Sequence, residues 1–138
     1  MAERKTVSSE QTPKAIGPYS PAVRSGDLLF TSGQLGMEPA SGNIVPGGAA
    51  AETRQALNNC AQLLKTAGGS LEDVLKTTVF LRDMADFQQM NSAYAEFFPH
   101  DPPARTTVQA AALPKGAAVE IECIARLSPR EKQIRRRK

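Results

Sequence analysis

The sequence has no tryptophan, one histidine and two cysteines among its 138 residues. It also has no apolar run near the roughly 20 residues that span a bilayer. Cys60 and Cys123 lie in apolar surroundings, so we expect buried free thiols rather than a disulfide or a zinc site. The start of the chain lacks the apolar segment of a secretory signal and contains Glu3, which leads us to expect a soluble, cytoplasmic protein.

The net charge of +3 is unevenly distributed along the chain. Residues 129–138 hold six Lys or Arg and one acid, a net of +5, whereas residues 1–128 hold 11 bases and 13 acids, a net of −2. We therefore expect a single domain over residues 1–128, long enough for its own core, followed by a basic tail over residues 129–138. Such a tail is either a disordered, solvated end or a segment that binds nucleic acid or another anionic surface.

Periodic patterns predict an alternation of strands and helices. Apolar residues every three or four positions predict two helices, over residues 49–67 and 83–98. Period-two or continuous apolar patterns predict strands, which we place at residues 22–25, 28–32, 74–82, 103–107 and 119–127. This order predicts an α+β protein with a mixed sheet and both helices on one face.

Some of the predicted strands are apolar on both faces. Leu28-Leu29-Phe30 and Thr78-Val79-Phe80 are examples. Because two helices on one side leave the other side of the sheet open, we predict a homo-oligomer whose sheets bury their open faces against one another. Such an arrangement also permits binding sites between subunits.

The last two predicted strands carry the residues of greatest chemical interest. Arg105 and Thr107 share one face of the first strand, and Glu120 and Glu122 share the polar face of the second. If these consecutive strands pair, Arg105 and Glu120 face the same space. A guanidinium grips a carboxylate through two hydrogen bonds, and a glutamate can move protons. From spacing alone, a surface salt bridge between Arg105 and Glu120 is the more ordinary interpretation.

Five short motifs follow one another along the domain. They are Ala15-Ile16-Gly17-Pro18-Tyr19-Ser20, Thr31-Ser32-Gly33-Gln34, Lys76-Thr77-Thr78-Val79, Pro103-Ala104-Arg105, and Leu113-Pro114-Lys115-Gly116 with Glu120-Ile121-Glu122. In this order the motifs resemble the reactive intermediate deaminase (Rid, or YjgF) family, from residue 12 to residue 128. The resemblance implies a chorismate-mutase-like α+β fold and a homotrimer whose sheets face inward, with clefts between neighbouring subunits. It also implies hydrolysis of 2-imino acids, such as 2-iminobutanoate and 2-iminopropanoate, to 2-oxo acids and ammonia without cofactor or metal.

The same resemblance assigns roles to individual residues. It places the carboxylate-binding arginine at Arg105 and the glutamate near the attacking water at Glu120. Thr107 stands where bacterial members carry a cysteine, so a hydroxyl remains but no thiol. The substrate-binding residues that the resemblance implies are Tyr19, Ser32, Gly33, Arg105 and Thr107.

Other candidate residues and functions receive less support from the sequence. His100 lies in a proline-rich turn and is expected to be solvated, and we leave Asn91 and Glu122 outside the predicted site. Two alternative functions stay open. One is an RNA-acting or translation-inhibiting protein, favoured only by the basic tail; the other is a module that binds small carboxylates or unfolded chains without turnover.

Overall fold

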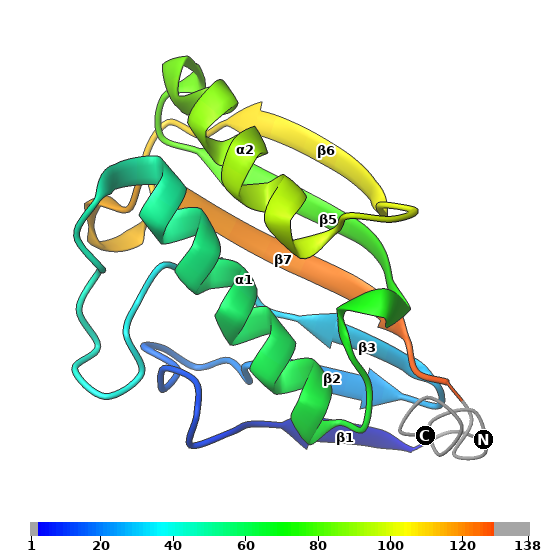
Figure 1. Cartoon of the computed structure of the whole chain (residues 1–138). Coiled ribbons are helices and arrows are strands. Elements are labelled where there is room, and N and C mark those ends of the chain that lie inside the picture. Colours follow the sequence, from blue (N-terminus) through cyan, green and yellow to red (C-terminus); the bar gives the residue numbers. More distant parts are fainter. Residues whose placement is uncertain (1–2, 129–138) are drawn as a thin grey trace.

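A computed structural model describes residues 3–128. It contains one sheet with two helices packed across the same face (Figure 1). The basic tail at residues 129–138 lies outside the described residues, and with it the expectation of a disordered end. Among residues 3–128, no helix has the length and apolar character needed to cross a bilayer.

The sheet has seven strands and is mixed. In spatial order the main path is β1-β2-β3-β7-β5-β6, with β4 paired to β7 beside this path. Only β5 and β6 pair in parallel, because α2 connects them by a crossover, and the other pairs are antiparallel. The predicted α+β class is therefore confirmed. The strands are β1 (Arg4–Val7), β2 (Ala22–Ser25), β3 (Leu28–Thr31), β4 (Gln34–Leu35), β5 (Val74–Leu81), β6 (Ala104–Gln109) and β7 (Val119–Arg126).

The predicted pairing of the last two strands is wrong. β6 and β7 are consecutive in the chain, but β5 lies between them and pairs with both. The physical reason is burial. Alternate residues of β7 are buried along its whole length, so it takes a central place, whereas β6 has no fully buried residue and forms an edge.

Helix α1 (Gly48–Thr66) begins where the sequence predicts a helix. Gly47 and Gly48 enter it with positive φ angles of 117° and 76°, a backbone conformation that glycine adopts readily. The predicted apolar stripe is buried under the helix, as Leu57 and Leu64 illustrate. Gly36 of the strand region lies so close that an added Cβ would come within 2.6 Å of the Glu52 backbone.

Helix α2 (Phe87–Phe97) follows a short 3₁₀ turn, Met84–Asp86. Asp86, at the N-cap position of α2, makes no side-chain capping hydrogen bond. The Asp83 carboxylate caps the 3₁₀ turn, because it accepts a hydrogen bond from the Ala85 amide at 2.9 Å. The buried side of α2 contains Met90 and Tyr94, as its periodicity predicts.

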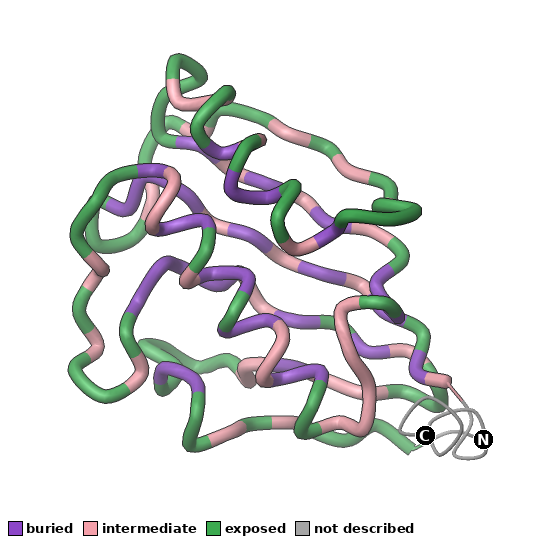
Figure 2. Tube along the Cα trace, viewed as in Figure 1, coloured by how far each residue is buried: buried purple, intermediate pink, exposed green. Residues whose placement is uncertain are grey.

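The core lies between the two helices and the sheet, and the opposite face of the sheet is partly exposed. Leu29, Val79 and Ile121 are fully buried on the helix side. On the other side, Phe30 and Val108 are 42% and 41% exposed, and Figure 2 shows the same alternation of buried and less buried positions along the strands. We call this second side the open face; its residues on the central and outer strands are Phe30, Thr78, Phe80, Thr106, Val108, Glu120, Glu122 and Ile124.

Candidate active site

Arg105 lies on β6 with its guanidinium under helix α2. Its central carbon is 4.8 Å from the ring centroid of Tyr94 and 5.7 Å from that of Phe87, both within cation–π range. One guanidinium nitrogen also contacts the Met90 sulfur at 3.9 Å. No carboxylate among the described residues forms an ion pair with Arg105, so the salt bridge to Glu120 that the spacing suggests does not form in this protomer. The guanidinium is thus held against aromatic rings and has no ion-pair partner among the described residues.

Tyr94 is itself held in place by the core. Its hydroxyl shares a 2.7 Å hydrogen bond with the hydroxyl of Thr77, a fully buried residue of β5. Its ring packs on Phe98 with centroids 4.8 Å apart. Burial is the main cause of a raised pKa for the Tyr94 hydroxyl, so this ring is a neutral platform for Arg105 at physiological pH.

Thr107 lies two residues after Arg105 on the same side of β6. Its hydroxyl oxygen is buried and has no hydrogen-bond partner among the described residues. A buried hydroxyl without a partner costs free energy unless a ligand or water satisfies it. Thr107 therefore offers an unused hydrogen-bonding group beside the guanidinium. We call Arg105, Thr107 and Tyr94 the arginine half of the site.

Glu120 lies on β7 with its side chain on the open face. It stands beside Phe80 of β5 and Leu35 of β4. A Cβ added to Gly33 would lie 2.7 Å from the Glu120 carboxyl carbon. Any larger residue at position 33 would therefore displace the Glu120 carboxyl group from its position against the backbone. The pKa of Glu120 is raised, first by burial and second by the negative charge of Glu122. A raised pKa suits a carboxyl group that exchanges protons near neutral pH.

A rigid turn lies beside Gly33. The Ser32 hydroxyl donates to the Ser20 carbonyl at 2.6 Å, and the Ser32 amide donates to the Pro21 carbonyl at 2.8 Å. The Tyr19 hydroxyl accepts from the Ile16 amide at 3.2 Å, and the residue is 46% exposed. Tyr19 and Gly33 line the same small hollow of about 20 Å³. We call Tyr19, Ser32, Gly33 and Glu120 the glutamate half of the site.

The two halves face opposite sides of the sheet within one protomer. Arg105 stands beside Thr77, and Thr77 stands beside Cys123; both of these neighbours are buried on the helix side. Glu120 has the opposite parity on β7 and faces away from the helices. The prediction that Arg105 and Glu120 face one space is therefore wrong for a single protomer. It rested on a direct pairing of β6 with β7, which the insertion of β5 prevents.

The remaining sequence candidates have simpler environments. His100 is exposed in the turn after α2, as expected, and Glu122 lies beside Glu120 on the open face. Cys60 and Cys123 are buried free thiols, which confirms that expectation. Within residues 3–128, no three His, Cys, Asp or Glu side chains gather as metal ligands.

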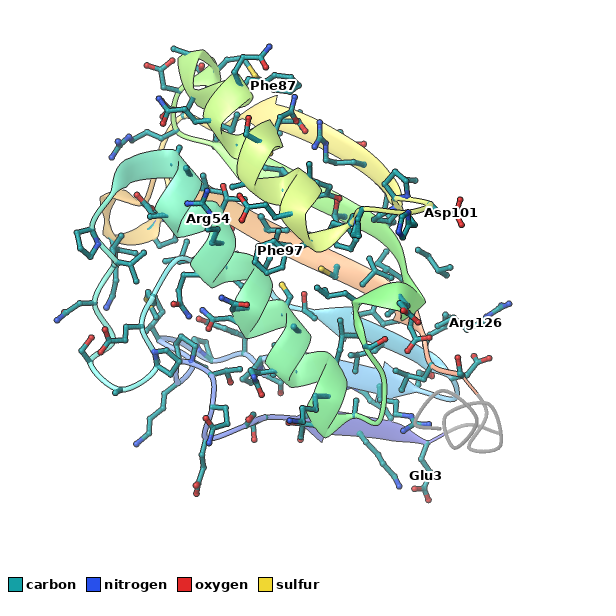
Figure 3. The ribbon with its side chains drawn as sticks, in the orientation of Figure 1. Glu3, Arg54, Phe87, Phe97, Asp101 and Arg126 are labelled. Atoms are coloured by element: carbon teal, nitrogen blue, oxygen red, sulfur yellow. The ribbon has the colours of Figure 1, made fainter. Side chains whose placement is uncertain are left out.

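The aromatic support of Arg105 was not identifiable as part of a site from the sequence. Phe87, Met90 and Tyr94 have the helical spacing of ordinary core residues. Figure 3 shows Phe87 in the first turn of α2, next to β6. Only the parallel pairing of β5 with β6 brings this side of the helix over the arginine.

Comparisons with known proteins agree with the sequence motifs over nearly the whole described chain. The family model described as Endoribonuclease L-PSP matches residues 9–127. A protein of Bos taurus named 2-iminobutanoate/2-iminopropanoate deaminase is 51% identical over 126 residues, which cover 91% of this chain and 92% of the bovine protein.

Solved structures show the same fold. The YjgF gene product of E. coli has a TM-score of 0.83 and 43% identity, covering 88% of this chain and 98% of that one. The E. coli TdcF structure with bound serine has a TM-score of 0.84 and 40% identity, covering 90% of this chain and 99% of that one. The similarity therefore extends across the described domain rather than one motif.

Proposed function

The chain belongs to the Endoribonuclease L-PSP family, which includes reactive intermediate deaminases, and on this basis we propose that it hydrolyses 2-imino acids to 2-oxo acids and ammonia. The observation that carries the proposal is its 51% identity to a named 2-iminobutanoate/2-iminopropanoate deaminase along 92% of that enzyme. The substrates we propose are accordingly 2-iminobutanoate and 2-iminopropanoate.

Arg105 binds the substrate carboxylate in this proposal. The guanidinium has the shape and charge for a bidentate grip, and its support by Tyr94 and Phe87 fixes the direction of that grip. The unpartnered Thr107 hydroxyl lies on the same side of the strand and provides a further hydrogen bond. Carboxylate binding places the neighbouring imine carbon at a defined distance from the protein's proton-transfer group.

Glu120 handles protons in this proposal. It accepts a proton from a water molecule while the water oxygen adds to the carbon of the N-protonated imine. This addition gives a tetrahedral amino alcohol. Glu120 passes this proton to the nitrogen and then removes the hydroxyl proton as the C–N bond breaks and the carbonyl forms. The second proton leaves with the ammonia as ammonium. Glu120 ends in its starting ionisation state, so the reaction needs no redox partner. A positioned acid–base group contributes roughly 10²- to 10⁴-fold to such a rate.

A complete site requires two subunits in this proposal. The arginine half and the glutamate half face opposite sides of one sheet, so one protomer cannot present both to one substrate. The open face carries the exposed apolar side chains of Phe30 and Val108, which a neighbouring subunit would cover. We propose a homotrimer in which the arginine half of one subunit meets the glutamate half of the next.

The proposed activity can be tested by competition for a short-lived imine. A threonine dehydratase generates 2-iminobutanoate in place, and semicarbazide traps the imine that persists. We expect the wild-type protein to reduce the trapped imine and to accelerate ammonia release. An unchanged rate of ammonia release and an unchanged trapped fraction would contradict the proposal.

No specific observation on the described residues supports either of the two alternative functions. The RNA-acting alternative rested on the basic tail, which lies outside the described residues. The binding-module alternative predicts carboxylate binding that depends on Arg105 without consumption of the imine. The trapping assay separates it from the deaminase, because a binding module leaves ammonia release at its uncatalysed rate.

A further inference from the structure

A second hollow lies outside the candidate active site. This groove has a volume of about 410 Å³, within the roughly 300–1,000 Å³ typical of ligand pockets. It runs between the 3₁₀ turn Leu71–Asp73 and the end of α2 with the turn that follows. Figure 3 shows Phe97 near the end of α2 and Asp101 in that turn. None of the residues assigned to the two halves of the active site lines this groove.

The groove is lined by both apolar and acidic residues. Phe97 and Phe98 come from α2, and Val74 comes from the start of β5. Glu72 contributes a carboxylate from the 3₁₀ turn, and Asp101 contributes another from the turn after α2. No lysine or arginine among the described residues lines the groove. Its chemistry therefore fits a cationic segment that also carries an apolar side chain.

The described chain ends beside this groove. The Ser128 hydroxyl donates to the Asp73 carboxylate at 3.0 Å. Asp73 lies between Glu72 and Val74, both of which line the groove, and its second oxygen accepts from the Ser70 amide at 2.9 Å. The bond to Asp73 therefore places Ser128 next to the 3₁₀ turn that forms one wall of the groove. Ten extended residues reach about 33–36 Å, far enough to follow the groove.

The composition of residues 129–138 complements the groove. The segment carries a net charge of +5 from six Lys or Arg and one Glu, and Ile134 is an apolar residue in its middle. We propose that residues 129–138 dock in this groove, with basic side chains beside Glu72 and Asp101 and with Ile134 against Phe97 and Phe98. Attachment at Ser128 gives the segment a high effective concentration at the groove, so weak surface ion pairs suffice to hold it.

Docking links the tail to the strand that carries Arg105. The turn after α2 contributes Pro99, His100 and Asp101 to the groove, and Pro103 is its last lining residue before β6. Arg105 is the second residue of β6. A docked tail would therefore contact the segment that leads into the arginine-bearing strand. This contact does not depend on the proposed reaction.

Zero-length cross-linking of the full-length wild-type protein tests the proposal. A carbodiimide joins a carboxylate to a lysine amine only when the two are in contact, and peptide mapping identifies the joined residues. We expect Lys132 or Lys138 joined to Glu72 or Asp101 in severalfold excess over the exposed acids Glu10 and Glu38. The excess should disappear near 1 M salt, where the Debye length falls to about 3 Å. Equal coupling to all four acids would overturn the proposal.

The single histidine gives an independent readout that does not require a cross-link. His100 lines the groove, so its ring proton resonance reports on what occupies it. We expect replacement of Arg135, Arg136 and Arg137 by Gln to shift this resonance. The matched control removes the same charge elsewhere and should leave the resonance in place; it replaces the exposed residues Lys5, Lys14 and Lys65 by Gln. An identical His100 resonance in the wild type and in the tail variant also overturns the proposal.

Discussion

Arg105 is distinguished by what surrounds it rather than by its place on a strand. Its guanidinium rests against two aromatic rings and lacks a carboxylate partner among the described residues. A surface arginine in an ordinary ion pair has the opposite arrangement, as Arg54 shows with Glu96 at 2.8 Å. An oriented guanidinium without an ion-pair partner suits the anion-binding role that we propose for Arg105.

The first prediction concerns the shape of this cation. Arg105→Lys keeps the charge but removes the planar pair of donors, so we expect kcat/KM for imine hydrolysis to fall roughly tenfold to a hundredfold, the loss of about one charged hydrogen bond. Steady-state kinetics with the dehydratase-coupled assay measures this change. Arg54→Lys is the matched control and should leave kcat/KM unchanged, because that pair is exposed and lies between the helices. Equal kinetics of both variants would remove Arg105 from the site.

The second prediction concerns pH. Burial first and Glu122 second raise the pKa of Glu120, so the ionised base is lost at a higher pH than for an ordinary glutamate. Glu122→Gln removes one of these causes. We therefore expect the acid limb of the kcat/KM profile to move to lower pH. Because the pKa of Glu120 is raised in the folded state, the folded protein loses stability as the pH rises through that pKa. Glu122→Gln lowers the pKa of Glu120, so the variant should be more stable than the wild type at neutral pH.

A structural role for Glu122 makes a different prediction. Loss of a purely structural carboxylate changes the melting temperature but leaves the acid limb of the profile in place. An acid limb that stays fixed, or that moves to higher pH, would contradict the proposed influence of Glu122 on Glu120. Glu38→Gln, at an exposed acid in the loop before α1, is the matched control for the change of net charge.

At the residue scale, motifs in the sequence single out candidate residues, but they do not reveal neighbours that only the fold brings together. Arg105, Glu120 and Gly33 belong to motifs of the family, and the structure gives each of them an environment suited to the expected role. Tyr94 has no such motif, because its contact with Arg105 depends on which strand lies under α2. Local patterns do not contain that information.

At the scale of secondary structure elements, two glycines near β4 are expected to differ in what they support: Gly33 the proposed function, and Gly36 the stability of the fold. Gly33 and Gly36 both make close approaches, but their neighbours differ. A Cβ on Gly33 would meet the end of the flexible Glu120 side chain, whereas a Cβ on Gly36 would meet the Glu52 backbone of α1 at 2.6 Å. A side chain can rotate away, but a helix backbone cannot do so without a shift of the helix.

The third prediction follows from this contrast. Gly33→Ala should lower kcat/KM because it displaces the Glu120 carboxylate, and it should leave the melting temperature nearly unchanged. Gly36→Ala should cost roughly 1–3 kcal/mol of unfolding free energy, the usual cost of overpacking. Thermal denaturation and steady-state kinetics of both variants provide the comparison. Normal activity of Gly33→Ala together with a large loss of stability would contradict the prediction, because it would show that activity does not depend on the position of the Glu120 carboxylate.

Elements were predicted well where their signals are local. Strands β2, β3 and β7 and the start of α1 lie within one or two residues of their predicted bounds. The order of strands across the sheet was predicted less well. Pairing β7 with β5 rather than with its neighbour in sequence depends on long-range burial, which a period-two pattern does not specify.

At the scale of the whole molecule, the sheet separates the two groups that the proposed reaction needs. The helices cover the face that carries Arg105, and the open face carries Glu120 together with exposed apolar side chains. Under the proposed function, a monomer is therefore incomplete in two ways: it exposes apolar surface to water, and the proposed acid–base group is remote from the proposed carboxylate-binding group. The proposed homo-oligomer would correct both.

The fourth prediction uses this separation. Arg105→Ala and Glu120→Gln should each abolish activity in a homo-oligomer, because every site then lacks one half. In mixed trimers of the proposed kind, one site of three combines the intact Glu120 of one variant with the intact Arg105 of the other. Random mixing at equal amounts should therefore restore about a quarter of wild-type activity. Co-expression of the two variants, followed by the imine-trapping assay, measures the recovery, and separately purified proteins mixed without subunit exchange are the control. If verified mixed trimers stay inactive, the proposal of a site shared between two subunits is wrong.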